Sequence, residues 1–257
     1  FHRTDHPQFF LNLKGKIGMK MKSVKFRMIA IALLSATMPF TAKAQDKVEA
    51  SVGADFVSNY IWRGTDCGGV SIQPSMGVSY KGLSLTAWGS VGIDKEDARE
   101  IDLTLGYNTG GFSVSVTDYW FSYHKEDGGY TGDYFKYGAH STVHIFEATL
   151  GYDFGPLALS WNTYFAGDDY TKENGDRAYS TYVGISAPFK LGGLDWSAEV
   201  GLTPWEGAYA NRFNVTNLTL KAEKEIKFTN SFSLPTFAQV TFNPHTQGAY
   251  FVFGVSF

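Results

Sequence analysis

Residues 249–257, with the sequence Ala-Tyr-Phe-Val-Phe-Gly-Val-Ser-Phe, decide the fold class of this chain. Phe251, Phe253, Val255 and Phe257 occupy alternate positions. Because successive side chains of a β-strand point to opposite faces, the segment predicts a strand with one apolar, aromatic face. A soluble protein seldom leaves such an edge strand exposed, because it promotes aggregation. In bacterial outer-membrane barrels a strand of this kind closes the sheet, and its final Phe is the mark that the barrel-assembly machinery reads. The segment therefore predicts a transmembrane β-barrel, provided that the pattern repeats.

The same alternation recurs along the chain between turn-forming segments. The clearest example is 100–107, where Ile, Leu, Leu and Tyr at odd positions alternate with Glu, Asp, Thr and Gly at even ones. In 213–226 the alternation changes parity near Asn217, which predicts a β-bulge. The pattern predicts strands at 48–63, 71–80, 83–93, 100–107, 112–123, 146–154, 157–165, 178–189, 194–202, 213–226, 232–242 and 249–257.

The connections between these segments alternate strictly between tight turns and longer polar loops. Short turns lie at 81–82, 108–111, 155–156, 190–193 and 227–230, and the first four contain Gly, whereas the longest polar stretch lies at 124–142. An even number of strands places both ends of the sheet on one side, with the short turns there and the loops opposite. We therefore predict an all-β fold: a transmembrane, antiparallel, up-and-down β-barrel of about twelve strands.

The first 44 residues differ in character from the rest. Residues 21–44 combine a basic start, a short apolar stretch and an Ala-Lys-Ala site before Gln45, which is typical of a secretory signal peptide. The apolar stretch is shorter than the roughly 20 residues that a membrane-spanning helix needs. Residues 1–20 precede a plausible start codon, and we interpret them as an upstream extension that is not native. The barrel is then expected to occupy residues 45–257, in the outer membrane of a Gram-negative bacterium, with both termini periplasmic.

The charge of the expected barrel is strongly negative. Residues 1–44 hold eight of the 22 Lys and Arg residues and one of the 25 Asp and Glu residues, so 14 basic and 24 acidic residues remain. A net charge of −10 argues against nucleic acid as a partner. The single cysteine, Cys67, excludes an intramolecular disulfide.

If the apolar face meets lipid, the opposite face lines the interior. We predict the pore-lining residues to be Asp55, Arg63, Trp88, Glu100, Asp102, Glu147, Tyr164, Glu199, Lys221 and Glu223. Their acidic excess favours cations or neutral molecules over anions. The predicted function is a porin-like channel for passive diffusion of small solutes. The alternative is a closed structural or adhesive barrel that acts through its outer loops, its interior filled by aromatic rings and paired charges.

Arg63 stands out because it is a basic residue on a mostly acidic face. A guanidinium in a low-dielectric interior needs a carboxylate partner. We predict that Arg63 lies at the outer end of the first strand and bridges to Glu100 and Asp102.

The segment 57–64, Val-Ser-Asn-Tyr-Ile-Trp-Arg-Gly, resembles the end of the first strand in the TorF-type porin family of bacterial outer-membrane proteins. The likeness continues at Gln73-Pro74, Trp88-Gly89-Ser90 and 100–107, and covers 56–123, a third of the expected barrel. Residues 118–123 depart from the Pro-containing ending that we associate with this family. The resemblance implies an outer-membrane channel without a defined substrate. The family motif in this chain consists of Tyr60, Trp62, Arg63 and Gly64.

Enzyme activity is not expected. His140 and Ser141 are adjacent, so on a strand they would face opposite sides and could not form a hydrolase pair. His140 and His144 are about 13 Å apart on a strand, too far to bind one metal ion. We predict no cofactor and no metal. The expected partners are outer-membrane lipid, the barrel-assembly machinery during insertion, and small solutes.

Overall fold

The structure is a computed structural model that describes residues 47–125, 129–229 and 232–257. The expected upstream extension and signal peptide lie outside the described residues. Within the described part of the chain the secondary structure consists of strands, turns and loops, without helices. No helix there is long and apolar enough to cross a membrane.

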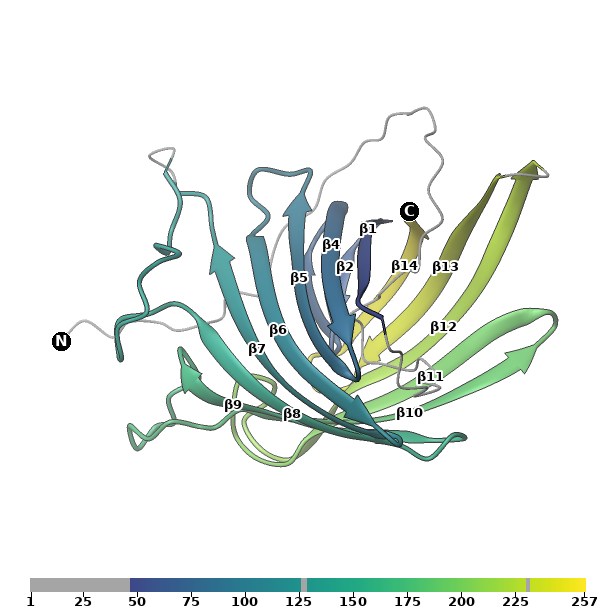
Figure 1. The fold of residues 1–257 in the computed structure, drawn as a ribbon. Coiled ribbons are helices and arrows are strands. Elements are labelled where there is room, and N and C mark those ends of the chain that lie inside the picture. The colour runs from purple at the N-terminus through teal and green to yellow at the C-terminus, as the bar shows by residue number, and fades with distance from the viewer. Residues whose placement is uncertain (1–46, 126–128, 230–231) are drawn as a thin grey trace.

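Twelve antiparallel strands form a closed barrel, and an additional two-stranded hairpin lies between the first two of them. The strands are long and tilted, and the wall curves round a common interior (Figure 1). The wall follows chain order, apart from the hairpin, which confirms the predicted up-and-down barrel of twelve strands. The wall strands are β1 (Glu49–Val57), β4 (Ser71–Tyr80), β5 (Leu83–Gly92), β6 (Arg99–Thr109), β7 (Phe112–Ser122), β8 (Ile145–Asp153), β9 (Ala158–Gly167), β10 (Thr181–Leu191), β11 (Leu194–Thr203), β12 (Asn214–Thr229), β13 (Phe232–Asn243) and β14 (Gly248–Ser256).

The first and last strands close the barrel. Asp55, Phe56 and Val57 of β1 pair with Ser256, Val255 and Gly254 of β14. Beyond this register, the backbone N–H of Phe257 donates to the carbonyl of Ala54 at 2.9 Å, and the N–H of Ala54 donates to the carbonyl of Phe257 at 3.2 Å. The terminal segment that predicts the fold is therefore the strand that seals the wall.

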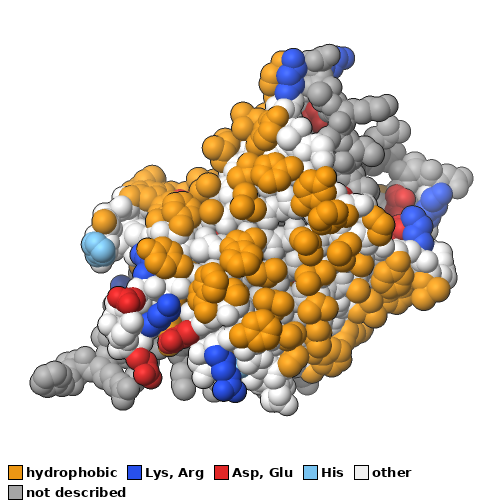
Figure 2. Space-filling model, turned by 90° about the horizontal axis from the view of Figure 1, so that it is seen from below, with side chains coloured by type: hydrophobic (Ala, Val, Ile, Leu, Met, Phe, Trp, Pro, Cys, Tyr) orange, Lys and Arg blue, Asp and Glu red, His pale blue; other side chains and the backbone are white. Residues whose placement is uncertain are grey.

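The outer face of the wall is apolar. Figure 2 shows a broad area of hydrophobic side chains across one side of the barrel. These side chains come from alternate positions of the strands, and their exposed fractions exceed one third, as expected for a surface that lipid would cover. Examples are Val52, Met76, Leu85, Leu103, Leu150, Trp161, Phe251 and Phe253.

Tight turns and long loops lie at opposite ends of the barrel, which we call the turn end and the loop end. The turn at Lys81-Gly82 has positive φ at both residues, 48° and 87°, the geometry of a two-residue hairpin turn. Gly110-Gly111 and Gly192-Gly193 repeat it with φ between 56° and 85°. The predicted sorting of short and long connections is thereby confirmed.

The bulge expected near Asn217 is present in β12. Gly201 pairs with Asn217, whereas the next residue of β11, Leu202, pairs with Val215. Thr216 is thus the extra residue in β12, which changes the parity of the strand at this point.

The first predicted strand, 48–63, is wrong in its second half. The structure ends β1 at Val57 and folds the following residues into the hairpin β2 (Tyr60–Trp62) and β3 (Thr65–Gly68). Tyr60 and Ile61 are buried instead of continuing the wall. The break has a physical reason: Ser58 makes the last hydrogen bonds to β14, and beyond it the aromatic side chains that continue the alternation pack inside the barrel.

Candidate functional site

The β2–β3 hairpin crosses the barrel interior at the loop end, and its tip is the two-residue turn Arg63-Gly64. Both residues have positive φ, 50° and 79°, which gives a tight hairpin of the same kind as the turns in the wall. A Cβ atom at Gly64 would lie 1.9 Å from the carbonyl oxygen of Thr216. Only glycine allows the tip to approach the bulged strand β12 so closely.

A second contact fixes the tip of the hairpin to the loop end of β13. The side-chain amide of Asn243, at the end of β13, donates to the carbonyl of Gly64 at 3.0 Å. Asn243 is buried, and its Oδ1 also accepts from the backbone N–H groups of His245 and Thr246. The hairpin is therefore docked by its backbone as well as by its side chains.

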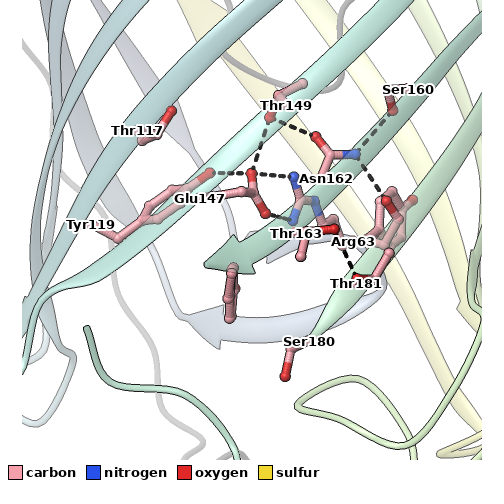
Figure 3. A network of polar contacts seen from close by, with 12 residues as sticks. Arg63, Thr117, Tyr119, Glu147, Thr149, Ser160, Asn162, Thr163, Ser180 and Thr181 are labelled. Atoms are coloured by element: carbon pink, nitrogen blue, oxygen red, sulfur yellow. Dashed lines mark hydrogen bonds and ion pairs between the residues drawn. The ribbon is translucent and has the colours of Figure 1, made fainter. Parts of the chain in front are cut away.

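Arg63 makes a bidentate ion pair with Glu147 of β8, on the opposite side of the interior (Figure 3). Nη1 donates to Oε2 at 2.6 Å, and Nη2 donates to Oε1 at 2.9 Å. The side chains are 9% and 1% exposed, so the pair is largely withdrawn from solvent. The predicted partners Glu100 and Asp102 are not the ones that Arg63 binds. The reason is the hairpin, which carries the guanidinium away from β6.

Aromatic side chains surround the guanidinium. Its carbon lies 4.3 Å from the ring centre of Trp62 and 4.8 Å from that of Tyr182. Tyr209, from the loop between β11 and β12, accepts a hydrogen bond from Arg63 Nη1 at 2.6 Å and donates to the hydroxyl of Tyr164 at 3.1 Å. Burial raises the pKa of Tyr209 to about 12, against the opposing effect of Arg63, so this hydroxyl remains a donor at neutral pH.

Glu147 is also held from the wall. Tyr119 of β7 donates to Glu147 Oε1 at 2.9 Å, and the hydroxyl of Thr149 approaches the same oxygen at 3.4 Å (Figure 3). Arg63 supplies two donors and Tyr119 a third, so both carboxylate oxygens of Glu147 accept hydrogen bonds. A buried charge in this state is stable only while its partners remain.

A neighbouring network extends the cluster to β11 and β12. The hydroxyl of Tyr182 donates to Glu199 Oε1 at 2.5 Å, while Asn217 donates to the same Tyr182 hydroxyl and the same Glu199 oxygen at 3.0 and 3.1 Å. We call the whole assembly the Arg63 cluster. It fills the loop end of the interior beside β7–β12, and its members are Trp62, Arg63, Tyr119, Glu147, Tyr164, Tyr182, Glu199, Tyr209 and Asn217.

The structure places the remaining predicted residues in two other regions. Trp88, Glu100 and Asp102 lie on β5 and β6 beside the other face of the hairpin, where the rings of Tyr60 and Trp88 are 5.5 Å apart. Lys221 and Glu223 lie further along β12 towards the turn end and form an ion pair of 2.6 Å, and Asp55 lies on β1 between Gln73 of β4 and Ser256 of β14. The C-terminal residues Phe251, Phe253, Val255 and Phe257 lie outside this interior, with their aromatic members exposed on the outer face.

The interior surface changes towards the turn end. There the inward positions of β4–β11 carry mainly hydroxyl groups and glycines in place of aromatic rings, and most of them are only half-buried. Hydroxyl and backbone groups are compatible with water, and the small side chains leave room for it. These residues include Ser79, Ser84, Ser113, Ser115, Gly151, Ser160 and Ser197.

Sequence reasoning places Tyr119 on the inward face but misses Tyr182, Tyr209 and Asn217 as members of the site. The strand residues share the inward parity of their neighbours, and this signal is sufficient to find them. Tyr209 lies in a loop without periodicity, and only its setting among the small residues Gly207, Ala208 and Ala210 marks it.

Within residues 47–125, 129–229 and 232–257, no group of three or more His, Cys, Asp and Glu side chains is placed to hold a metal ion. At the loop end, the interior consists of ion pairs and aromatic rings, and the β2–β3 hairpin crosses it. No family, no curated protein and no solved structure matches this chain.

Proposed function

We propose that this protein is an outer-membrane channel for passive diffusion of small solutes, cations or neutral molecules, narrowed at its loop end by the β2–β3 hairpin. The observation that carries the proposal is the contrast between the two faces of the wall. The outer face is apolar along the strands, and the inner face is polar and small towards the turn end. A wall of this kind suits lipid outside and water inside.

The orientation follows from the two ends of the barrel. In single-chain bacterial barrels the short turns and both termini are periplasmic and the longer loops are extracellular. The turn end of this barrel would then open to the periplasm. The Arg63 cluster would lie near the extracellular mouth, where it could limit the size of entering solutes.

The charges of the interior support the preference for cations or neutral molecules. Arg63 is neutralised by Glu147, and Lys221 by Glu223. The carboxylates of Asp55, Glu100, Asp102 and Glu199 then remain as an acidic excess. Carboxylate groups along a narrow water path attract cations and repel anions.

The hairpin gives a physical role to the motif that resembles the TorF-type porin family, and we propose that the chain belongs to this family. Tyr60 and Trp62 are the aromatic residues of β2, and Arg63-Gly64 is its turn. Each motif residue thus has a contact inside the barrel. In the same proposal, the exposed aromatic face that ends at Phe257 is the surface for the barrel-assembly machinery.

The test is single-channel conductance and reversal potential of the purified barrel in a planar bilayer under a salt gradient. Steady openings with a cation-selective or near-neutral reversal potential support the proposal. Anion selectivity contradicts the proposed solute class.

One observation favours a closed structural barrel as the second candidate: the Arg63 cluster fills part of the interior at the loop end. A variant in which a short Gly-Ser linker replaces residues 58–70 separates the two. If only the variant conducts, the native barrel is closed under these conditions. If native protein and variant both conduct, with larger openings in the variant, the hairpin is a constriction of an open channel.

A further inference from the structure

Glu100 and Asp102 form a second buried charged group, separate from the Arg63 cluster. Both lie on the inward face of β6, and they are 5% and 8% exposed. The Oδ1 atom of Asp102 is buried and has no hydrogen-bond partner. A buried polar atom without a partner is rare in folded proteins and points to a ligand, ion or water at that place.

No basic group compensates these two carboxylates. Among the described residues, no salt bridge involves Glu100 or Asp102. Arg63 is engaged by Glu147. The neighbouring Arg99 belongs to the outer face of β6, where its guanidinium lies 4.0 Å from the ring centre of Tyr130.

The atoms around the two carboxylates form an oxygen-rich site between the hairpin and the wall. The two carboxyl groups are separated by one residue on the same buried face of β6, and the buried Tyr60 of the hairpin lies beside them. Trp88 is the cross-strand neighbour of Asp102 on β5 and packs against the ring of Tyr60. Two neighbouring buried carboxyl groups repel each other when both are charged, unless a proton or a cation offsets the repulsion.

A shared proton offsets the repulsion between the two groups but leaves Asp102 Oδ1 without a partner. A cation explains both, because it attracts every oxygen that faces it. Carboxylate and hydroxyl oxygens are the ligands of hard cations such as Ca²⁺. We propose that Glu100, Asp102 and the Tyr60 hydroxyl form a binding site for a partly hydrated hard cation, with Ca²⁺ as its representative.

The site is suited to brief occupancy. Two carboxylates and one hydroxyl supply fewer protein ligands than the six to eight oxygens that Ca²⁺ takes, so water must complete the shell. Conduction needs sites that bind strongly enough to admit an ion and weakly enough to release it. The inference deepens the proposed channel function and rests on it in one respect, namely that cations reach this part of the interior.

The first test is the heat-dependent gel mobility of the barrel in detergent, measured at constant ionic strength with increasing Ca²⁺. We expect the unfolding temperature of the native protein to rise with Ca²⁺, because a ligand that binds only the folded state stabilises it. The double variant Glu100→Gln/Asp102→Asn should lose this rise. The control Glu223→Gln, which removes an exposed interior carboxylate, should keep it. An equal response of the native protein and the double variant, or no response in either, overturns the proposal.

The second test does not require the double variant to fold. Tb³⁺ replaces Ca²⁺ at oxygen sites and emits when a nearby indole is excited. We expect sensitised emission from the native protein that Ca²⁺ displaces, that is lost in Trp88→Phe, and that persists in Trp161→Phe, where the indole lies on the outer face. Emission that is absent, or that does not depend on Trp88, contradicts the site.

These readouts distinguish the site from the channel. A Ca²⁺ response without any conductance would support the cation site and contradict the proposed function. Conductance without Ca²⁺ or Tb³⁺ binding would support the proposed channel function and contradict the cation site.

Discussion

Arg63 and Glu147 are 84 residues apart in the chain and meet in a bidentate ion pair inside the barrel. Replacing Arg63 by Ala leaves the Glu147 carboxylate buried without its cation. We expect this change to lower the free energy of unfolding by about 3–5 kcal/mol, as for other broken buried pairs. Urea titration of the barrel in lipid vesicles measures the loss.

The double variant Arg63→Met/Glu147→Gln serves as the control for this pair. It removes both charges at similar volume, and should therefore recover a large part of the stability that Arg63→Ala loses. In planar bilayers Arg63→Ala should also open the loop end and increase conductance. If Arg63→Ala is as stable as the native protein, the ion pair between Arg63 and Glu147 does not hold the hairpin in place.

Gly64 provides a test of the hairpin tip that does not involve charge. Gly64→Ala places a methyl group against the carbonyl of Thr216 and strains a residue with φ of 79°. The matched control is Gly192→Ala, where φ is 62° and no atom lies within 4 Å of the new Cβ. Backbone strain alone costs about 1–2 kcal/mol. Gly64→Ala should lower the free energy of unfolding by more than Gly192→Ala does, as measured by the same urea titration. Equal losses would mean that the tip is not tightly docked.

The location of the barrel in a membrane can be tested at Leu103, which is exposed on the outer face of β6. If lipid covers this face, Leu103→Arg should cost about 2–4 kcal/mol near the middle of the bilayer. The inward Ser115→Arg should cost less, because its side chain reaches the interior. Folding titrations in phosphatidylcholine vesicles measure both. A neutral Leu103→Arg would contradict the membrane location.

His144 holds the long loop between β7 and β8 to the wall. Its side chain is fully buried, with Nδ1 2.7 Å from Asp118 Oδ1 and Nε2 2.7 Å from the carbonyl oxygen of Tyr134. Loss of such contacts by His144→Ala, about 1–2 kcal/mol, should multiply the open population of the loop by about 5–30-fold. Trypsin cleavage after the exposed Lys136, followed by mass spectrometry, should accelerate accordingly. The exposed His140 offers the control His140→Asn, which should be cleaved at the native rate.

The sequence predicts the wall of this barrel well, because alternation and turn chemistry are local signals. The bulge in β12 is foreseen from the parity change near Asn217, and Lys81-Gly82 is recognisable as a hairpin turn without any tertiary information. The inward face of each strand follows from the same alternation. Glu147 and Glu199 are therefore identified as interior residues before their partners are known.

The hairpin could not be predicted in the same way. Tyr60 and Trp62 continue the parity of β1, so the pattern does not mark where the wall ends. The hairpin turns into the interior of the barrel, and this interior exists only after strands that are distant in the sequence have closed the wall. The partner of Arg63 depends on this path, and so does the contribution of Tyr209 from a loop without periodicity.

The anchors of the hairpin tip have a consequence for the order of folding. Residues 63 and 64 contact Glu147, Tyr209 and Asn243, at sequence separations of 84, 146 and 179 residues. Closing loops of this length is slow, because the chain loses conformational entropy before the contacts between its two ends can stabilise it. The hairpin leaves the ribosome among the first parts of the barrel, yet it can reach its final position only after β8 to β13 have assembled around it.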